Sequence, residues 1–176
     1  MKKNLTRQQI ERVIRAVTDE IEADWLLVGG AAVALWYQES RSTEGVDLVE
    51  PSEAPSHRLE LLKTAAALDL PIEALNSAAD FFVRIVQRWD EDIVLLRSGA
   101  RGRLFRPSPT NFLIMKLARL SEQDLEDCRA LLSSTEVAGP LDRKRVLEAL
   151  AALPEAGDVS LDERRQELRR LIDFHR

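Results

Sequence analysis

Two adjacent glycines and a later carboxylate form the most suggestive chemical pattern in this chain. Gly29 and Gly30 follow a short apolar run, and Asp47 lies in the next apolar run. Glycines let backbone N–H groups approach a ligand closely, and the N-terminus of a helix favours negative charge. A carboxylate on the neighbouring strand can then hold a metal ion. The pattern is typical of a site for a nucleotide phosphate beside a metal.

The elements that must position this site can be predicted from the apolar spacing. Trp25–Val28 and Val46–Val49 are short, apolar runs that predict buried strands, and Ala31–Tyr37 predicts a buried helix between them. Thr6, with Gln9 three residues later, predicts a capped helix from Thr6 to about Ala23. The remaining predicted elements of this half are a helix over His57–Leu68 and strands over Phe81–Val86, Ile93–Leu96 and Leu104–Phe105, with a loop or hairpin at Ser98–Gly102.

The second half of the chain has helical spacing throughout. Pro107 and Pro109 mark a boundary, and Ser108, Ser121 and Asp142 are suitable helix caps. The predicted helices are Thr110–Leu120, Glu122–Leu132, Leu141–Leu153 and Leu161–Phe174. We therefore predict an α+β core over residues 1–106 and a helical part over residues 107–176 that packs on it.

Composition excludes several classes of protein. The chain has 176 residues, one cysteine (Cys128) and two histidines that lack metal-ligand spacing, so we expect neither an internal disulfide nor a usual zinc site. It contains no apolar run long enough for a transmembrane helix and no leader-like N-terminus, so we expect a cytoplasmic protein. The net charge of −5 argues against non-specific binding of nucleic acid by the whole surface.

The stretch VGGAAVALWYQESRSTEGVDL resembles the nucleotidyltransferase-fold superfamily, in particular its small bacterial proteins with Gly-Gly followed by Arg-x-Thr-x-Asp-x-Asp. The toxins of AbiE-type toxin–antitoxin systems are relatives with comparable features. A second block, PTNFLIMKLARLSEQDLEDCRALL, is similar to the lysine helix and acidic helix of these proteins, with Lys116, Arg119, Asp124 and Asp127 in matching places. The resemblance implies a small mixed β-sheet flanked by helices, with a helical C-terminal segment.

The resemblance also implies a chemistry. A nucleoside triphosphate would be held by Gly29, Gly30, Arg41 and Thr43. Asp47 would bind Mg²⁺ and act in transfer of a nucleotide to RNA or protein, and Lys116 would bind phosphate. Asp124 and Asp127 are interpreted as ion-pair partners of the cationic helix rather than as metal ligands.

The metal site is incomplete in the sequence, because Gly45 stands where the first aspartate of the pattern belongs. Side chains two residues apart on a strand share a face, so Glu44 would help only through a bulge at Gly45. Asp92 is the predicted third carboxylate, with Asp90 and Asp80 as alternatives. Gly45 is either a natural feature of a degenerate member or an engineered change that silences an enzyme.

Three hypotheses follow. In the first, the chain is a nucleotidyltransferase impaired by Gly45, with the toxin of a toxin–antitoxin pair as one form of it and a cognate antitoxin or a second copy as partner. Alternatively, it is an inactive binding or regulatory protein on the same fold, or a structural α/β domain whose matches are accidental. The arginines at 97, 101, 103 and 106 form either a phosphate or RNA contact or a solvated hairpin.

Overall fold

The computed structural model describes residues 4–52, 57–77, 79–134, 140–155 and 157–174. The chain divides into two compact units, Met1–Pro107 and Ser108–Arg176, which are described separately below. The first unit has the element order α1 (Arg7–Glu20), β1 (Asp24–Val28), α2 (Gly29–Trp36), β2 (Val46–Val49), α3 (Arg58–Ala67), the 3₁₀ turn η1 (Ile72–Ala74), β3 (Leu75–Asn76), α4 (Asp80–Arg84), β4 (Ile93–Ser98) and β5 (Arg103–Pro107).

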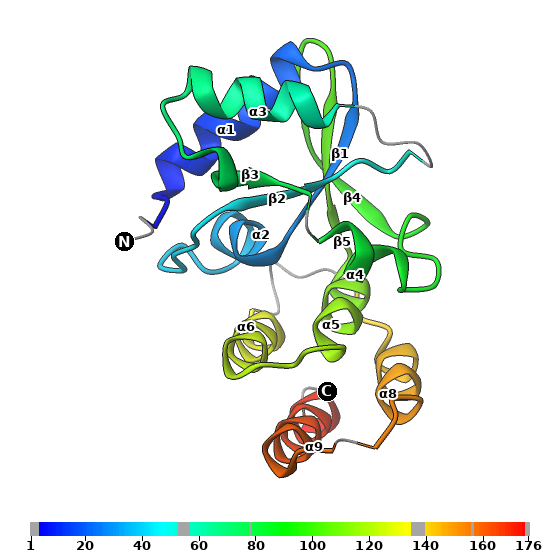
Figure 1. Ribbon diagram of the computed structural model, residues 1–176. Coiled ribbons are helices and arrows are strands. Elements are labelled where there is room, and N and C mark those ends of the chain that lie inside the picture. The colour runs from blue at the N-terminus through cyan, green and yellow to red at the C-terminus, as the bar shows by residue number, and fades with distance from the viewer. Residues whose placement is uncertain (1–3, 53–56, 78, 135–139, 156, 175–176) are drawn as a thin grey trace. The chain divides into compact units, whose positions relative to one another are not determined.

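The strands of the first unit form one five-stranded mixed sheet in the order β3-β2-β1-β5-β4 (Figure 1). The central strand β1 pairs antiparallel with β2 and parallel with β5. Strand β3 pairs parallel with β2 at the edge of the sheet. The expected α+β fold, a mixed sheet flanked by helices with helices at the C-terminal end, is confirmed.

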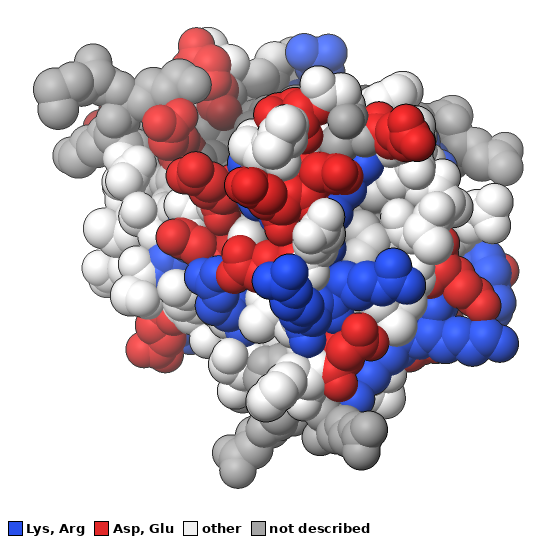
Figure 2. Space-filling view, turned by 90° about the horizontal axis from the view of Figure 1, so that it is seen from below, with Lys and Arg blue, Asp and Glu red and all other residues white. Residues whose placement is uncertain are grey.

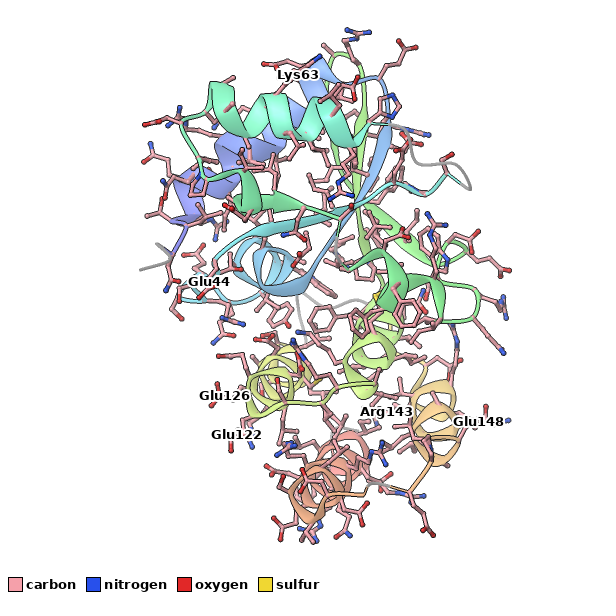
Figure 3. The ribbon with its side chains drawn as sticks, viewed as in Figure 1. Glu44, Lys63, Glu122, Glu126, Arg143 and Glu148 are labelled. Carbon is pink, nitrogen blue, oxygen red and sulfur yellow. The ribbon has the colours of Figure 1, made fainter. Side chains whose placement is uncertain are left out.

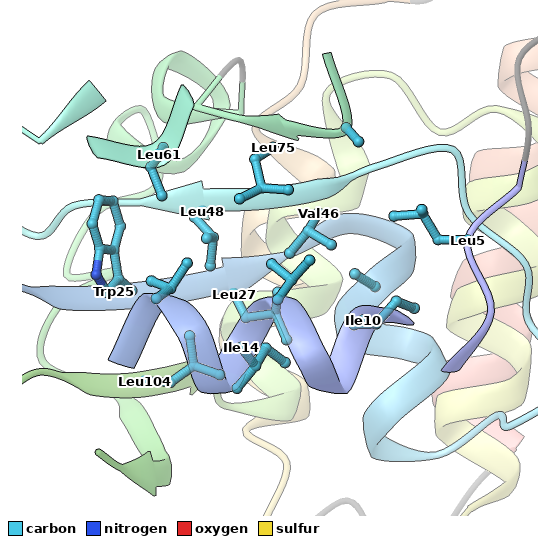
Figure 4. Packing of buried hydrophobic residues seen from close by; sticks show 14 of the residues in the cluster. Leu5, Ile10, Ile14, Trp25, Leu27, Val46, Leu48, Leu61, Leu75 and Leu104 are labelled. Carbon is cyan, nitrogen blue, oxygen red and sulfur yellow. The ribbon is translucent and has the colours of Figure 1, made fainter. Parts of the chain in front are cut away.

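The main core of this unit lies between one face of the sheet and three helices, α1, α2 and α3. Because side chains alternate along a strand, Trp25 and Leu27 of β1 share this face with Leu48 of β2. Ile10 and Ile14 of α1 pack against them (Figure 4). The alternate residues of β1 and β2, Asp47 among them, therefore project from the opposite face.

The described residues of the second unit form helices, and three of these helices begin at a residue whose side chain caps them. Ser108, Ser121 and Asp142 accept hydrogen bonds from the backbone N–H groups of the first turn, and Thr6 of the first unit makes a full capping box with Gln9. These four predicted caps are confirmed. The helices among the described residues of this unit are α5 (Pro109–Leu117), α6 (Glu122–Ser133), α8 (Arg143–Ala151) and α9 (Val159–Phe174).

One predicted strand is wrong. The segment 81–86 contains most of helix α4, Asp80–Arg84, followed by a turn. Its buried residues, Val83 and Val86, lie three positions apart, which is helical spacing, and the Arg84 guanidinium pairs with the Asp80 carboxylate at 2.8 Å over an i,i+4 step. Phe81 and Phe82, a residue type common in strands, are exposed in the structure.

Candidate functional site

The start of α2 lies directly against the carboxylate of Asp47. Gly29 has a φ of 67°, a left-handed conformation that favours glycine. A Cβ atom added at Gly29 would lie 2.5 Å from Oδ2 of Asp47, which is closer than non-bonded atoms allow. The register explains this proximity, because Val28 at the end of β1 is paired with Asp47 on β2. Only glycine therefore lets β1 turn into α2 beneath this half-buried carboxylate.

The second glycine contacts the loop that leads into β2. A Cβ atom at Gly30 would lie 2.9 Å from the Thr43 hydroxyl and 3.5 Å from Nη2 of Arg41. The Thr43 hydroxyl donates a hydrogen bond to the Gly45 carbonyl at 3.0 Å, which fixes the loop around the helix start. The structure thus brings Gly29, Gly30, Arg41, Thr43 and Asp47 together at the N-terminus of α2.

This arrangement can bind an anion. Backbone N–H groups of the first turn of a helix are unpaired within the helix, and the helix dipole favours negative charge there. Arg41 adds a cation and Thr43 a hydroxyl at the same end of α2. A phosphate group is the ligand that such a combination suits best.

Position 45 lies close to the η1 turn and to strand β3. A Cβ atom at Gly45 would lie 3.2 Å from the Ala74 carbonyl oxygen, 3.4 Å from Nδ2 of Asn76 and 3.6 Å from the Glu73 carbonyl oxygen. Glu44 is exposed on the segment before β2 (Figure 3), and the pairing of β2 with β1 has no register shift that would turn it inward. Neither residue supplies a second carboxylate beside Asp47.

The candidates for a third carboxylate lie elsewhere. Asp90 and Asp92 are exposed in the turn before β4, three strands from β2, or roughly 14 Å at the usual strand spacing. That separation exceeds what two aspartates can bridge to a shared ion, so the sheet order disfavours Asp92 as a ligand. Asp80 is paired with Arg84.

The residues around Asp47 do not fit the two-ion cage that the resemblance implies. Within the described ranges, no three carboxylate, histidine or cysteine side chains lie together so that they could hold a metal ion. We therefore derive no reaction step through a pair of metal ions.

Lys116 lies in the second unit, in a buried ionic cluster. Its ammonium donates to Asp124 at 2.8 Å and to Asp127 at 2.9 Å, and both carboxylates are almost fully buried. Arg119 also binds Asp124, at 2.8 Å, so two cations meet two anions. Burial alone would lower the pKa of the ammonium, but the carboxylates of Asp127 and Asp124 outweigh it and raise that pKa. The ion pairing predicted for the two aspartates is confirmed.

The arginine-rich hairpin between β4 and β5 is largely neutralised by carboxylates of α1 and the chain that follows it. Three arginines form such pairs: Arg97 with Asp19 at 3.2 Å, Arg101 with Glu22 at 3.3 Å, and Arg103 with Asp24 at 2.5 Å. Arg106 differs, since it is buried and stacks 3.8 Å from the ring centre of Trp36. Burial lowers the pKa of its guanidinium. The paired arginines favour the solvated-hairpin interpretation over an RNA contact.

The charged surface of the second unit is also of mixed sign. Arginines and glutamates line a groove of about 340 Å³ between α6 and α9, where Arg129 pairs with Glu167. Positive and negative side chains are interleaved on the face seen in Figure 2. Such a mixed face does not favour non-specific binding of nucleic acid.

The comparison with known families agrees with this fold. The family model described as "Nucleotidyltransferase of unknown function (DUF6036)" matches residues 6–173. The chain therefore belongs to this nucleotidyltransferase family. No match was found among curated proteins or among solved structures. None of the helices in the described ranges combines the length and the apolar character needed to cross a bilayer.

Proposed function

We propose that this protein binds a nucleoside triphosphate at the N-terminus of α2 and transfers its nucleotide to a hydroxyl of RNA or protein. The observation that carries the proposal is the position of the Asp47 carboxylate over the Gly29 backbone, with Thr43 and Arg41 against Gly30. In this proposal, Gly29, Gly30, Arg41 and Thr43 hold the phosphates. Asp47 would hold the magnesium ion that accompanies the nucleotide, and this ion would neutralise charge on the phosphates.

The proposed transfer is an in-line displacement at the α-phosphorus. The acceptor hydroxyl oxygen forms a bond to this phosphorus while the bond to the bridging oxygen of the β-phosphate breaks. Pyrophosphate leaves with that electron pair, and the hydroxyl proton passes to solvent. With a single carboxylate beside the phosphates, we expect slow transfer, because little negative charge is available to hold further cations there.

The contacts of Lys116 support a structural role rather than a catalytic one. Both carboxylates that it contacts are buried, so a phosphate would have to displace Asp124 or Asp127 to reach its ammonium. We propose that the cluster holds α5 against α6.

A toxin of a toxin–antitoxin pair, acting in the cytoplasm and held by an antitoxin, is a biological setting that fits slow transfer. The second candidate is an inactive binding protein that acts through a protein partner. The observation that favours it is Gly45, which leaves Asp47 without a second carboxylate two residues earlier on its strand.

Label transfer tests the proposal. The protein is incubated with each of the four α-labelled ribonucleoside triphosphates, with Mg²⁺ or Mn²⁺, and with mixed tRNA or a protein extract. Weak labelling that Asp47→Asn abolishes and the matched Asp92→Asn leaves unchanged is the expected result. Nucleotide binding without any labelling would favour the binding protein, and absence of both would refute the proposal.

A further inference from the structure

Strand β4 lies at the edge of the sheet and exposes an unbroken apolar run. It is the last strand in the order β3-β2-β1-β5-β4, and within the described ranges no further strand pairs with its outer edge (Figure 1). The side chains of Val94, Leu95 and Leu96 are 38%, 52% and 41% exposed. Proteins usually protect such an edge with charged residues, prolines or a covering element, because its backbone groups can pair with another strand. Consecutive exposed apolar residues on an edge strand therefore indicate an interaction surface.

The outer edge of β4 presents the backbone groups of two residues. Ile93 is paired with Pro107 on β5, and this pair is of the non-hydrogen-bonded type because proline has no N–H. The two types alternate along an antiparallel ladder, so the pair of Leu95 with Phe105 is of the same type. The N–H and C=O groups of Ile93 and Leu95 therefore point away from β5. A β-bulge between Leu95 and Arg97 ends this regular stretch.

Side chains of opposite charge flank the apolar run. Glu91 and Asp92 are exposed in the turn before β4, and Arg97 follows the run. Within the chain, Glu91 pairs with Arg88 and Arg97 pairs with Asp19, but all four of these side chains remain at least 36% exposed. A guanidinium carries several N–H donors, so Arg97 can bind a second carboxylate. Antiparallel pairing of two such strands brings the acidic end of each beside the basic end of the other.

We infer that β4 pairs antiparallel with β4 of a second copy of this chain, about a two-fold axis at Val94. In this register, Ile93 of each copy exchanges hydrogen bonds with Leu95 of the other. The two Val94 residues face each other at the axis, with Cα atoms about 4.5 Å apart. Glu91 lies opposite Arg97 of the other copy. A two-fold interface must be complementary to itself, and the order of charges along β4 meets this requirement.

A groove beside the strand adds to the surface that a second copy can cover. The groove has a volume of about 390 Å³ and is lined by Leu96 of β4, Ile14 of α1 and Leu35 of α2, among others. Val94 of the second copy lies diagonally across from Leu96 and covers apolar surface at this end of the groove. The whole contact is small, so we expect a reversible dimer with micromolar affinity. The inference is independent of the proposed function, because β2 lies three strands from β4.

Sedimentation equilibrium of the full chain, across the micromolar range, measures the affinity. Val94→Lys places like charges opposite each other at the axis and should raise the dissociation constant about tenfold. Val159→Lys is the matched control and should leave it unchanged, since Val159 is exposed on α9. Glu91→Arg should raise the dissociation constant roughly threefold. Glu148→Arg also breaks an exposed ion pair within one chain and should have no effect.

A disulfide tests the register. Residues that face each other in a non-hydrogen-bonded pair lie within the Cα separation that a disulfide spans. Under mild oxidation, Val94→Cys should therefore form a covalent dimer, whereas Val159→Cys should not. The native Cys128 is buried and does not compete.

Three results would overturn the inference: a chain that stays monomeric at every concentration, a dimer that Val94→Lys does not weaken, or a failure of Val94→Cys to crosslink. A monomer whose β4 amides are protected from hydrogen exchange would also contradict it, because another part of the chain would then cover this edge. Circular dichroism verifies that each variant is folded. If Val94→Lys does not fold, the affinity of Glu91→Arg and the crosslink of Val94→Cys decide the inference.

Discussion

Replacing Lys116 by methionine should destabilise the protein strongly. Its side chain is only 11% exposed, and the carboxylates of Asp124 and Asp127 that it contacts are 1% and 0% exposed. Methionine keeps most of the apolar stem but removes the charge. Arg119 still neutralises Asp124, whereas Asp127 loses the ammonium 2.9 Å away. Removal of one partner from a buried ion pair costs about 3 to 5 kcal/mol, so we expect a loss in that range at neutral pH.

The pH dependence of the unfolding free energy is a second measurable consequence of this ion cluster. Burial opposes the charge on Asp124, but its bonds to Arg119 and Lys116 hold the pKa of that carboxyl well below its usual value of 3.8. A folded-state pKa below the unfolded one stabilises the protein above about pH 4, and this stabilisation fades as the pH falls further. Folding raises the pKa of the Lys116 ammonium above its usual 10.5. This group therefore stabilises the folded protein fully below about pH 10.5 and progressively less as the pH rises further.

Urea denaturation followed by circular dichroism, at pH 7 and at pH 4, measures both effects. The loss of unfolding free energy in Lys116→Met should be smaller at pH 4 than at pH 7, because the stabilisation that the Lys116 ammonium gives the Asp124 carboxylate begins to fade there. Lys144→Met is the matched control, since Lys144 is 85% exposed and 3.8 Å from Glu148. It should lose less than about 0.5 kcal/mol. The double variant Lys116→Met/Asp127→Asn should recover much of the loss. The reasoning would be refuted if Lys116→Met lost less than about 1 kcal/mol of unfolding free energy, or if the double variant lost as much as Lys116→Met.

Three further predictions concern single residues. Gly29→Ala should lower the unfolding free energy by about 2 kcal/mol and weaken ATP binding, because the added methyl group meets Asp47 and the backbone is left-handed. The control is Gly157→Ala, because no atom lies within 4 Å of a Cβ added at Gly157. Equal effects of the two substitutions in calorimetry would contradict the site geometry. Cys128 is buried, and burial raises the pKa of its thiol to about 12, so a thiol-reactive dye should label it only on unfolding; rapid labelling of the native protein at pH 8 would be inconsistent with this burial. Thr6→Ala should cost about 1 kcal/mol in thermal or urea unfolding through loss of the capping box, and an unchanged stability would mean that α1 does not depend on it.

Local sequence patterns were sufficient to predict the elements that build the site. The apolar run Trp25–Val28 followed by two glycines predicts the strand and helix that the structure contains as β1 and α2. The caps were also predictable, because serine, threonine and aspartate bind the N–H groups of their own helix. These features depend on residues close together in the chain.

Features that depend on distant residues were missed. Strand β3 has only two residues, Leu75 and Asn76, too few for a periodic pattern. Its pairing with β2 sets Asn76 level with Asp47 and brings the Ala74 carbonyl oxygen close to Gly45, so the sequence alone showed Gly45 only as a missing ligand.

The central claim is that a triphosphate binds at the N-terminus of α2, and backbone amide chemical shifts test it most directly. The ¹⁵N-labelled protein is titrated with each ribonucleoside triphosphate in the presence of Mg²⁺. We predict that the amide signals of Gly29 and Gly30 shift most, and that Thr43→Val reduces these shifts. Saturable shifts confined to other elements, with Gly29 and Gly30 unchanged, would contradict the claim.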